Sequence, residues 1–268
     1  MLNAPCYVLS DAHLGFAHDD VERSVIAFLR HVATHAGSLL INGDLFEFWF
    51  EWKTVIPRRA FRAVAALADV VDAGVPVTMI AGNHDCWGGD VLRNDVGVDY
   101  RFGPLVADIG GWKTHVDHGD GLRPAEDKGY RALRRVLRNR LAIRAYRWLH
   151  PDLATPLATH SSNTSRTYTA RDGGRGLRDA AERVAAADPS LDLIVFGHSH
   201  VATLERLAAG PVYANPGSWL DAPTFLVIDD ERVAMRQWLG SAESADLHTF
   251  HRSAKKTLAE LKELKRIV

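Results

Sequence analysis

The sequence is poor in cysteine, has no long hydrophobic run and carries almost no net charge. Its two cysteines, Cys6 and Cys86 in 268 residues, are too few for a disulfide framework, fit a reducing compartment and are assigned no metal. No apolar run approaches the roughly 20 residues that span a bilayer. The first residues lack the basic and apolar segments of a secretory signal. These absences predict a cytoplasmic protein, with a peripheral position on the inner membrane as the alternative.

The net charge of −1 provides no overall field for nucleic acid, so no nucleic-acid partner is expected. No sequence feature indicates an obligate protein partner, and the chain has no internal repeat or low-complexity segment. An apolar content of 47% over 268 residues suits one large core. We therefore predict that residues 1–268 form a single domain.

Apolar runs alternate with helical periodicity in the first third of the chain. Residues 7–9, 39–41 and 75–81 are typical of buried strands, and apolar side chains recur at helical spacing in 20–35 and 57–73. This order predicts parallel β-α-β units in an α/β fold with two sheets. A further buried strand is expected at 191–196, followed by antiparallel strands up to 238. Apolar residues from Leu247 to Val268 predict a final helix.

A basic helical stretch covers residues 123–148, and we expect a helical insertion from about 123 to 190 that lies over the strand ends. Its arginines and apolar stripe suit an anionic lipid surface, and they equally suit an ordinary amphipathic helix with a solvated basic face. A dense aromatic cluster, which indicates a partly exposed apolar surface, follows Asp44 at Phe46, Phe48, Trp49, Phe50 and Trp52.

Potential metal ligands gather at the ends of the apolar runs, beside small residues. Each motif alone is weak, since Asp-x-His and Gly-Asp are more often turn or surface features. Together, in order and at strand ends, they indicate a two-metal centre with Asp44 as the bridging carboxylate. The first ion is expected on Asp11, His13, Asp44 and His200, and the second on Asp44, Asn83, His118 and His198.

This constellation predicts a hydrolase in which a hydroxide between the two ions attacks a phosphate ester or anhydride. His84 and Asp85 are the predicted catalytic residues outside the metal shell. His84 would stabilise phosphoryl oxygens or protonate the leaving group, and Asp85 would orient His84. Asp120 is expected to orient His118 in the same way.

The motifs Asp-x-His, Gly-Asp, Gly-Asn-His-Asp, a later His and Gly-His-x-His resemble the calcineurin-like metallophosphoesterase superfamily over residues 7–228. The resemblance implies a four-layer α/β/β/α sandwich. It also implies a pair of divalent ions, with Mn²⁺ as the expected metal and Fe or Zn²⁺ as alternatives.

A narrower resemblance is to the UDP-2,3-diacylglucosamine pyrophosphatases of lipid A synthesis. It is carried by 43–49 (GDLFEFW), by 118–122 (HGDGL) and by Asp127-x-Gly129-Tyr130. It implies cleavage of the pyrophosphate of a nucleotide-linked glycolipid to UMP and 2,3-diacylglucosamine 1-phosphate, with the insertion as a substrate lid. The implied substrate contacts are Asn83, His84, Asp127, Ser162, Asn163, Ser165, Arg166 and His198.

The chain departs from that narrower family at His84, where many members carry Arg. An arginine only stabilises charge, whereas a histidine also donates a proton. Two other functions therefore stand beside the lipid substrate. One is a soluble metallophosphoesterase for nucleotides, phosphoproteins or other phosphodiesters. The other is a catalytically silent scaffold on the same fold.

Overall fold

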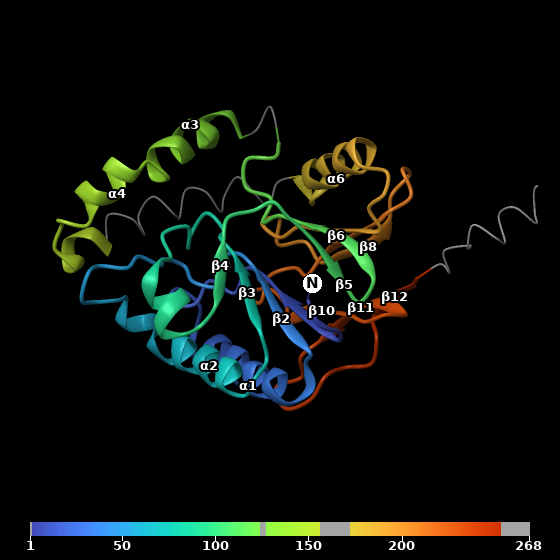
Figure 1. The fold of residues 1–268 in the computed structure, drawn as a ribbon, viewed down its shortest axis with the longest axis horizontal. Coiled ribbons are helices and arrows are strands. Elements are labelled where there is room, and N and C mark those ends of the chain that lie inside the picture. The colour runs from blue at the N-terminus through green and yellow to red at the C-terminus, as the bar shows by residue number, and fades with distance from the viewer. Residues whose placement is uncertain (1, 124–126, 156–171, 253–268) are drawn as a thin grey trace, which may run out of the picture.

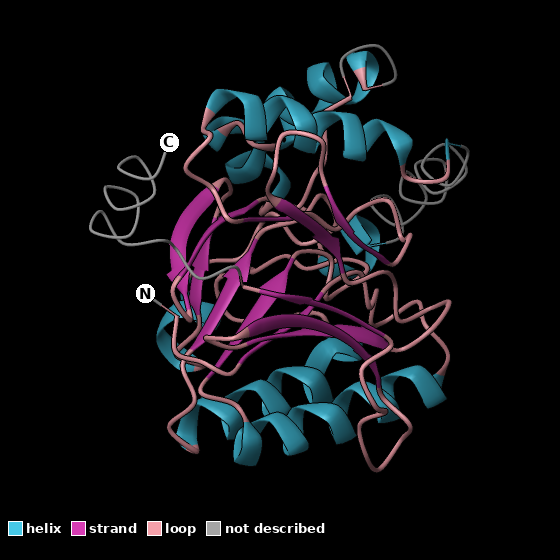
Figure 2. Cartoon of the chain, turned by 90° about the vertical axis from the view of Figure 1, so that its right-hand side faces the viewer, coloured by secondary structure: helices cyan, strands magenta, loops and turns pink. Residues whose placement is uncertain are grey.

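Two β-sheets pack face to face with helices on their outer sides in the computed structural model of the chain, which describes residues 2–123, 127–155 and 172–252. Figure 2 shows the layers in order, with helices below the larger sheet and above the smaller one. The predicted four-layer α/β/β/α sandwich is confirmed. The family resemblance implied this sandwich, and the strand and helix alternation of the sequence predicted its α/β class with two sheets.

The larger sheet holds seven strands in the order β12-β11-β10-β1-β2-β3-β4. Strands β1 to β4 pair in parallel, and β10, β11 and β12 add antiparallel pairs beside β1. The carboxyl ends of the parallel strands therefore share one edge. The bounds are β1 Cys6–Leu9, β2 Ser38–Asn42, β3 Val77–Ile80, β4 Asp99–Arg101, β10 Thr224–Ile228, β11 Arg232–Gln237 and β12 His248–His251.

The smaller sheet holds five strands in the order β5-β6-β7-β9-β8. The central strands β6, β7 and β9 run parallel, whereas β5 and β8 are antiparallel edge strands. The bounds are β5 Leu105–Ile109, β6 Trp112–Val116, β7 Leu193–Val195, β8 Thr203–Arg206 and β9 Val212–Asn215.

The central strands of each sheet are buried on both faces, which explains their continuous apolar runs. Side chains alternate along β1, so Tyr7 and Leu9 pack towards the outer helices and Cys6 and Val8 pack between the sheets. The outer layer of the larger sheet is α1 (Asp19–His35) and α2 (Phe61–Asp72), with the short helices η1 (Arg58–Ala60) and η2 (Val91–Asp95) nearby. The outer layer of the smaller sheet is α6 (Arg175–Ala187), which packs Leu177 against Ile194 and Phe196.

The predicted insertion divides into two parts. Helix α6 belongs to the four layers, whereas α3 (Lys128–Leu137) and α4 (Arg140–Tyr146) stand outside them and arch over one side of the molecule (Figure 1). Residues 151–155 add a short helical segment after α4. Within the described part of the chain, no helix has the length and apolar content needed to cross a bilayer.

Two expectations for other parts of the chain are wrong. Residues 248–251, predicted to lie in a final helix, form β12 and pair with β11, and the remainder of that predicted helix lies outside the described residues. The aromatic cluster after Asp44 is not an exposed surface, because none of its five residues is more than 8% exposed. Its outer members, Phe48, Phe50 and Trp52, pack against Ile143, Tyr146 and Ala154 of the insertion.

Candidate two-metal site

All seven predicted metal ligands meet at one edge of the sandwich. They follow the carboxyl ends of β1, β2, β3, β6 and β7, where open α/β sheets gather ligand-binding side chains. The ligand atoms form three overlapping groups, with atoms within 4.8 Å of one another in each. The groups are Asp11, His13 and His200; His13, Asp44 and His84; and Asp44, His118 and His198.

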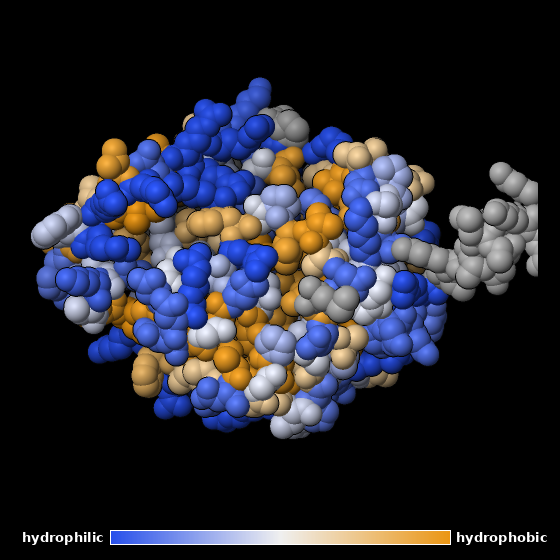
Figure 3. All heavy atoms as spheres, in the orientation of Figure 1, coloured by the Kyte–Doolittle hydropathy of each residue, from blue (hydrophilic) through white to orange (hydrophobic). Residues whose placement is uncertain are grey.

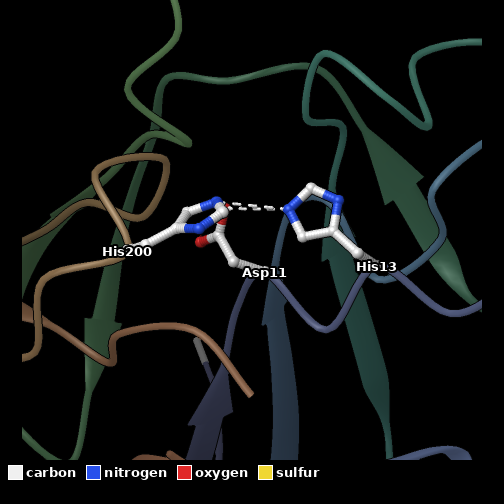
Figure 4. A group of neighbouring side chains, drawn as sticks. All are labelled: Asp11, His13 and His200. Carbon is white, nitrogen blue, oxygen red and sulfur yellow. Dashed lines mark hydrogen bonds and ion pairs between the residues drawn. The ribbon is translucent and has the colours of Figure 1, made fainter. Parts of the chain in front are cut away.

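The first group brings Asp11, His13 and His200 together (Figure 4). His200 Nε2 lies 3.3 Å from Asp11 Oδ1 and 3.2 Å from His13 Nε2. His13 Nδ1 lies 3.0 Å from Glu47 Oε2, and a carboxylate only accepts hydrogen bonds, so the proton of neutral His13 is on Nδ1. His13 Nε2 therefore presents a lone pair beside the Asp11 carboxylate, which is an arrangement that a cation satisfies.

The third group, Asp44, His118 and His198, gathers around Asp44 and His118. His118 Nδ1 contacts the carbonyl oxygen of Asn42 at 2.9 Å, which leaves Nε2 directed at Asp44 Oδ2, 3.1 Å away, and at Asn83 Oδ1, 3.3 Å away. Acceptor atoms converge here as in the first group. Asp44 shares one group with His13 and another with His118, which is the position that a bridging carboxylate requires.

The backbone is strained at these ligands. In the described part of the chain, five residues other than glycine have positive φ, with values between 48° and 61°. All five are predicted metal ligands: Asp11, His13, Asp44, His198 and His200. Left-handed backbone at bulky residues costs free energy, and it persists at functional sites because the surrounding fold holds it there.

Three motif glycines are required by the close approach of ligand side chains. A Cβ atom at Gly82 would clash with Asp44 Oδ1, and one at Gly43 would clash with the His118 ring. A Cβ atom at Gly197 would overlap Ser10 Oγ and lie 2.8 Å from Asp11 Oδ2. The glycine in each motif therefore makes room for a predicted metal ligand that follows another strand.

Each ligand carboxylate uses one oxygen for the backbone and leaves the other for the site. Asp11 Oδ2 accepts the N–H of His198 at 3.0 Å, and Asp44 Oδ1 accepts the N–H of His84 at 2.9 Å. Asp11 Oδ1 is buried and faces His200 Nε2 at 3.3 Å without a well-aligned hydrogen bond from the described residues. Such an atom is costly unless a cation occupies the site. The mixed oxygen and imidazole donors fit Mn²⁺, Fe or Zn²⁺.

The predicted ligands His13, His198 and Asp44 have the protonation state that suits metal binding, and two others do not. Burial lowers the pKa of both His13 and His198 to about 3, so both rings are neutral at pH 7. Burial alone would raise the pKa of Asp44, but the neighbouring His118, His84 and His13 hold it well below its usual range. Metal ligation requires neutral imidazoles and ionised carboxylates.

The two predicted ligands that lack this protonation state are His118 and His200. Burial alone would lower the pKa of both, but Asp44 raises the pKa of His118 and Asp11 raises the pKa of His200. A bound ion would therefore displace a proton from these rings.

Asp85 holds two site loops together through backbone contacts. Its carboxylate accepts the N–H of Gly82 and the N–H of Leu45, both at 2.8 Å. Burial, followed by the charge of Asp44, raises the pKa of Asp85 to about 7. Sequence analysis expected Asp85 to accept the ring N–H of His84, but its described contacts are with the backbone after β2 and β3.

Glu47 takes the place beside His84 that was expected for Asp85. His84 Nδ1 lies 3.0 Å from the Glu47 carbonyl oxygen and 3.6 Å from Glu47 Oε2. The sequence alone predicted no function for Glu47. Its presence in the 43–49 motif was the one signal that could have drawn attention to it.

The comparisons with known proteins agree with this geometry. The sequence model of the calcineurin-like phosphoesterases matches residues 4–202. The chain belongs to the calcineurin-like phosphoesterase family. Proteins of this family use divalent metal ions, and the three ligand groups are where this member would bind them.

Two curated relatives share one name, and this chain matches each of them over nearly its whole length. UDP-2,3-diacylglucosamine hydrolase from Porphyromonas gingivalis is 28% identical over 87% of this chain and 97% of that protein. The enzyme of that name from Xanthomonas oryzae pv. oryzae is 30% identical over 86% of this chain and 97% of that protein. Among solved structures, vacuolar protein sorting 29 from Cryptosporidium parvum has a TM-score of 0.48 and 15% identity, over 92% of this chain and 97% of that chain.

The substrate contacts expected in the insertion of this family member remain predictions. Asp127 is buried, and its carboxylate accepts hydrogen bonds from the Arg123 guanidinium, with Arg123 Nη2 2.8 Å from Asp127 Oδ1. In this structure it therefore anchors the start of α3. The other candidates of the insertion, Ser162, Asn163, Ser165 and Arg166, lie outside the described residues.

Asp120 joins the site to α3. Tyr130 donates its hydroxyl to Asp120 Oδ2 at 2.6 Å, and Arg134 and Arg138 approach the same oxygen at 3.3 Å and 3.5 Å. Sequence analysis expected Asp120 to orient His118, a place that the Asn42 carbonyl occupies. The His-Gly-Asp motif thus connects the predicted metal ligand His118 to the insertion.

A cavity of about 1340 Å³ lies beside the site, with Leu14 and Glu47 in its wall. Its remaining walls come mainly from residues 52–60 and from the part of the insertion between residues 144 and 155. The apolar lining includes Phe48, Trp52, Val55, Ile56, Trp148 and Leu149, and the cationic lining includes Lys53, Arg58, Arg59, Arg144 and Arg147. A cavity with these walls suits a ligand that is part anion and part hydrocarbon.

Proposed function

We propose that this protein hydrolyses the pyrophosphate of UDP-2,3-diacylglucosamine, releasing UMP and 2,3-diacylglucosamine 1-phosphate. The observation that carries the proposal is a complete two-metal ligand set beside a large cavity with apolar and cationic walls. The names of the two curated relatives support the substrate, because the chain matches 97% of the length of each.

We propose Mn²⁺ as the native metal, with Fe or Zn²⁺ as the alternatives that the donor set also accepts. Asp11, His13, Asp44 and His200 would hold one ion, and Asp44, Asn83, His118 and His198 the other. When bound, such ions supply positive charge at the phosphoryl oxygens and lower the pKa of water.

The residues outside the ligand set would position the phosphoryl group and move a proton. His84 donates Nδ1–H to the Glu47 carbonyl, which directs Nε2 towards Asp44. Hydrolysis adds water across the anhydride: one P–O bond forms, the bridging P–O bond breaks, and the departing phosphate needs charge stabilisation or a proton. A protonated His84 would supply either the charge stabilisation or the proton from Nε2. Asn83 and His198 complete the proposed phosphate contacts.

The insertion would act as the substrate lid, with α3 and α4 as its described helices. Support comes from the end of α4 and residues 147–155, which form one wall of the cavity. Apolar residues there would contact acyl chains, and the arginines would contact phosphate. Asp127 would act indirectly by holding Arg123 and the start of α3.

We further propose that the insertion contacts the membrane surface from which a lipid substrate is taken. Its exposed apolar side chains include Leu141 at 70%, Trp148 at 91% and Leu153 at 72% exposure. They lie among arginines of α4, and Figure 3 shows the insertion at the upper left as a largely hydrophilic surface with hydrophobic groups among it. Exposed apolar groups with cationic neighbours suit anionic lipid headgroups.

The decisive experiment measures Mn²⁺-dependent UMP release from UDP-2,3-diacylglucosamine beside hydrolysis of bis-p-nitrophenyl phosphate. We expect efficient UMP release and weak diester turnover. Diester turnover without UMP release would keep the metal site and reject the lipid substrate, leaving a general phosphodiesterase. Absence of bindable Mn²⁺ together with absence of both activities would indicate a silent scaffold.

A further inference from the structure

Glu47 has a carboxylate that is buried next to the two-metal site. The residue is 5% exposed and lies three positions after Asp44 in the segment that follows β2. A buried carboxylate must be hydrogen-bonded or paired, because its desolvation is costly. The partners of Glu47 therefore indicate what the residue does.

The backbone around Glu47 is fixed against the segment that carries His13. His13 N–H donates to the Asp44 carbonyl at 3.0 Å, Leu14 N–H donates to the Leu45 carbonyl at 2.9 Å, and Glu47 N–H donates to the Leu14 carbonyl at 3.0 Å. These three hydrogen bonds hold the segments after β1 and β2 side by side. The side chain of Glu47 is thereby placed next to the His13 ring without dependence on a mobile loop.

The two ends of Glu47 hold two imidazoles. Its carboxylate lies 3.0 Å from His13 Nδ1, and its backbone carbonyl lies 3.0 Å from His84 Nδ1. The two rings are perpendicular, with centroids 4.7 Å apart. Both contacts are to oxygens that accept only, so both neutral rings carry their proton on Nδ1 and present Nε2 to the site.

We propose that Glu47 is a positioning residue that orients His13 as a metal ligand and His84 as the group facing the phosphoryl oxygens. Carboxylates that accept the second N–H of a ligating histidine fix its tautomer and raise its basicity. Glu47 does this for His13 and also fixes the ring of His84, so one residue couples the metal shell to the proposed proton donor.

The chain provides a matched control in Glu51. Glu51 is also 5% exposed and lies four positions further along the same segment. Its carboxylate accepts the indole N–H of Trp49 and the backbone N–H groups of Gly89 and Val91, and it has no described contact with a histidine. Glu47→Gln and Glu51→Gln therefore remove the same charge at the same burial, and only the former changes a histidine contact.

The test measures Mn²⁺ binding to metal-free protein by isothermal titration calorimetry, with thermal unfolding of the metal-free variants as the fold control. We expect Glu47→Gln to weaken one of the two sites by about tenfold to a hundredfold, and Glu51→Gln to leave both affinities unchanged. Wild-type affinity in Glu47→Gln, or equal weakening in both variants, overturns the proposal. The inference rests on the proposed metal centre, and its readout requires no lipid substrate, so its failure is distinguishable from a wrong substrate.

A second measurement uses the wild-type chain and decides the matter even if Glu47→Gln does not fold. In metal-free protein labelled with ¹⁵N-histidine, long-range ¹H–¹⁵N spectra report the tautomer of each ring. A free imidazole favours the Nε2–H form. We expect His13 and His84 in the Nδ1–H form, because Glu47 accepts both protons. An Nε2–H tautomer at either ring overturns the proposal.

Discussion

The metal edge of the sheets and the α3–α4 part of the insertion differ in how they are held. The ligands at the metal edge are fixed by strand ends, by backbone hydrogen bonds to their carboxylates and by left-handed backbone. By contrast, neither α3 nor α4 has a single buried residue. The insertion is attached mainly through Asp120 and through the aromatic cluster around Phe48, Phe50 and Trp52.

This difference in attachment suits a division of labour, with the chemistry at the metal edge and the selection of substrate in the insertion. Groups that must keep sub-ångström geometry belong on rigid elements, whereas segments with few buried contacts have low local stability and open readily. As the proposed substrate lid, the insertion would thus admit a bulky substrate without disturbing the ligands. Mutations at the metal edge should impair every substrate, and mutations in the insertion should impair only large ones.

The largest effect is expected for Asp44→Asn, which breaks the bridging position. Loss of the shared carboxylate charge should reduce metal content and lower turnover of both the lipid and the small diester by about 1000-fold or more, the scale of lost transition-state charge stabilisation. Metal analysis and kinetics on both substrates measure this. Full metal content in Asp44→Asn would contradict the bridging assignment.

An intermediate effect is expected where the two regions meet. Asp120→Asn weakens the contacts of a buried carboxylate with Tyr130, Arg134 and Arg138. Loss of a charged hydrogen bond is worth about 1.5–3 kcal/mol, so we expect KM for the lipid to rise by about tenfold or more. The kcat for bis-p-nitrophenyl phosphate should be unchanged.

Tyr130→Phe removes the α3 side of the same contact, the hydroxyl that donates to Asp120. It should raise KM for the lipid by a smaller factor than Asp120→Asn does. Steady-state kinetics on both substrates measure the two variants. If either variant lost metal or diester activity, Asp120 would support His118 rather than the insertion.

The sequence was informative where the fold follows from local rules. Parallel strands bring their carboxyl ends to one edge, so Asp11, Asp44 and Asn83 could be placed together from strand order alone. Glu47 could not, because its place beside His13 depends on pairing between the segments after β1 and β2, seen in the contact of Leu14 with Phe46. A contact between loops that are distant in sequence has no local signal.

The two wrong expectations about the fold have similar causes. Leu247 and Phe250 have helical spacing, but the free edge of β11 offers backbone hydrogen bonds, and residues 248–251 pair with it instead. The aromatic density after Asp44 correctly marked an apolar patch. What covers the patch is the distant segment around Tyr146 and Ala154, and the pattern near Asp44 contains no information on it.

A smaller effect is expected for the outer surface of the insertion. Leu141→Ser and Leu153→Ser remove exposed apolar side chains that do not line the cavity. Each should weaken binding to anionic phospholipid vesicles by about fivefold. This corresponds to roughly half the free energy gained by fully burying such a side chain. Phe61→Ser on α2 is the matched control, since Phe61 is 64% exposed but lies outside the insertion. Equal losses in vesicle co-sedimentation for all three variants would remove the insertion as the membrane contact.

The smallest effect is expected for an ion-pair network around Arg236, which lies outside both the metal edge and the α3–α4 part of the insertion. It tests whether this network, rather than the metal edge, sets the stability of the fold in acid. Arg236 pairs with Glu243 and with Asp246. Burial alone would raise the pKa of both carboxyls, but hydrogen bonds, including those from Arg236, lower them. Because the folded pKa values are depressed, the stabilisation is present above the unfolded values of about 4. It is lost as the pH falls through the folded values.

Arg236→Met should therefore lower the Tm of the metal-free protein at pH 7 by a few degrees. The difference from wild type should shrink progressively below pH 4, as the carboxyls are protonated in both proteins and the lost ion pairs no longer contribute. Thermal unfolding followed by circular dichroism from pH 7 to pH 2 measures this. A Tm difference that stays constant from pH 7 to pH 2 would mean that Arg236 stabilises β11 by packing of its side chain. Acid sensitivity would then arise at the metal edge instead.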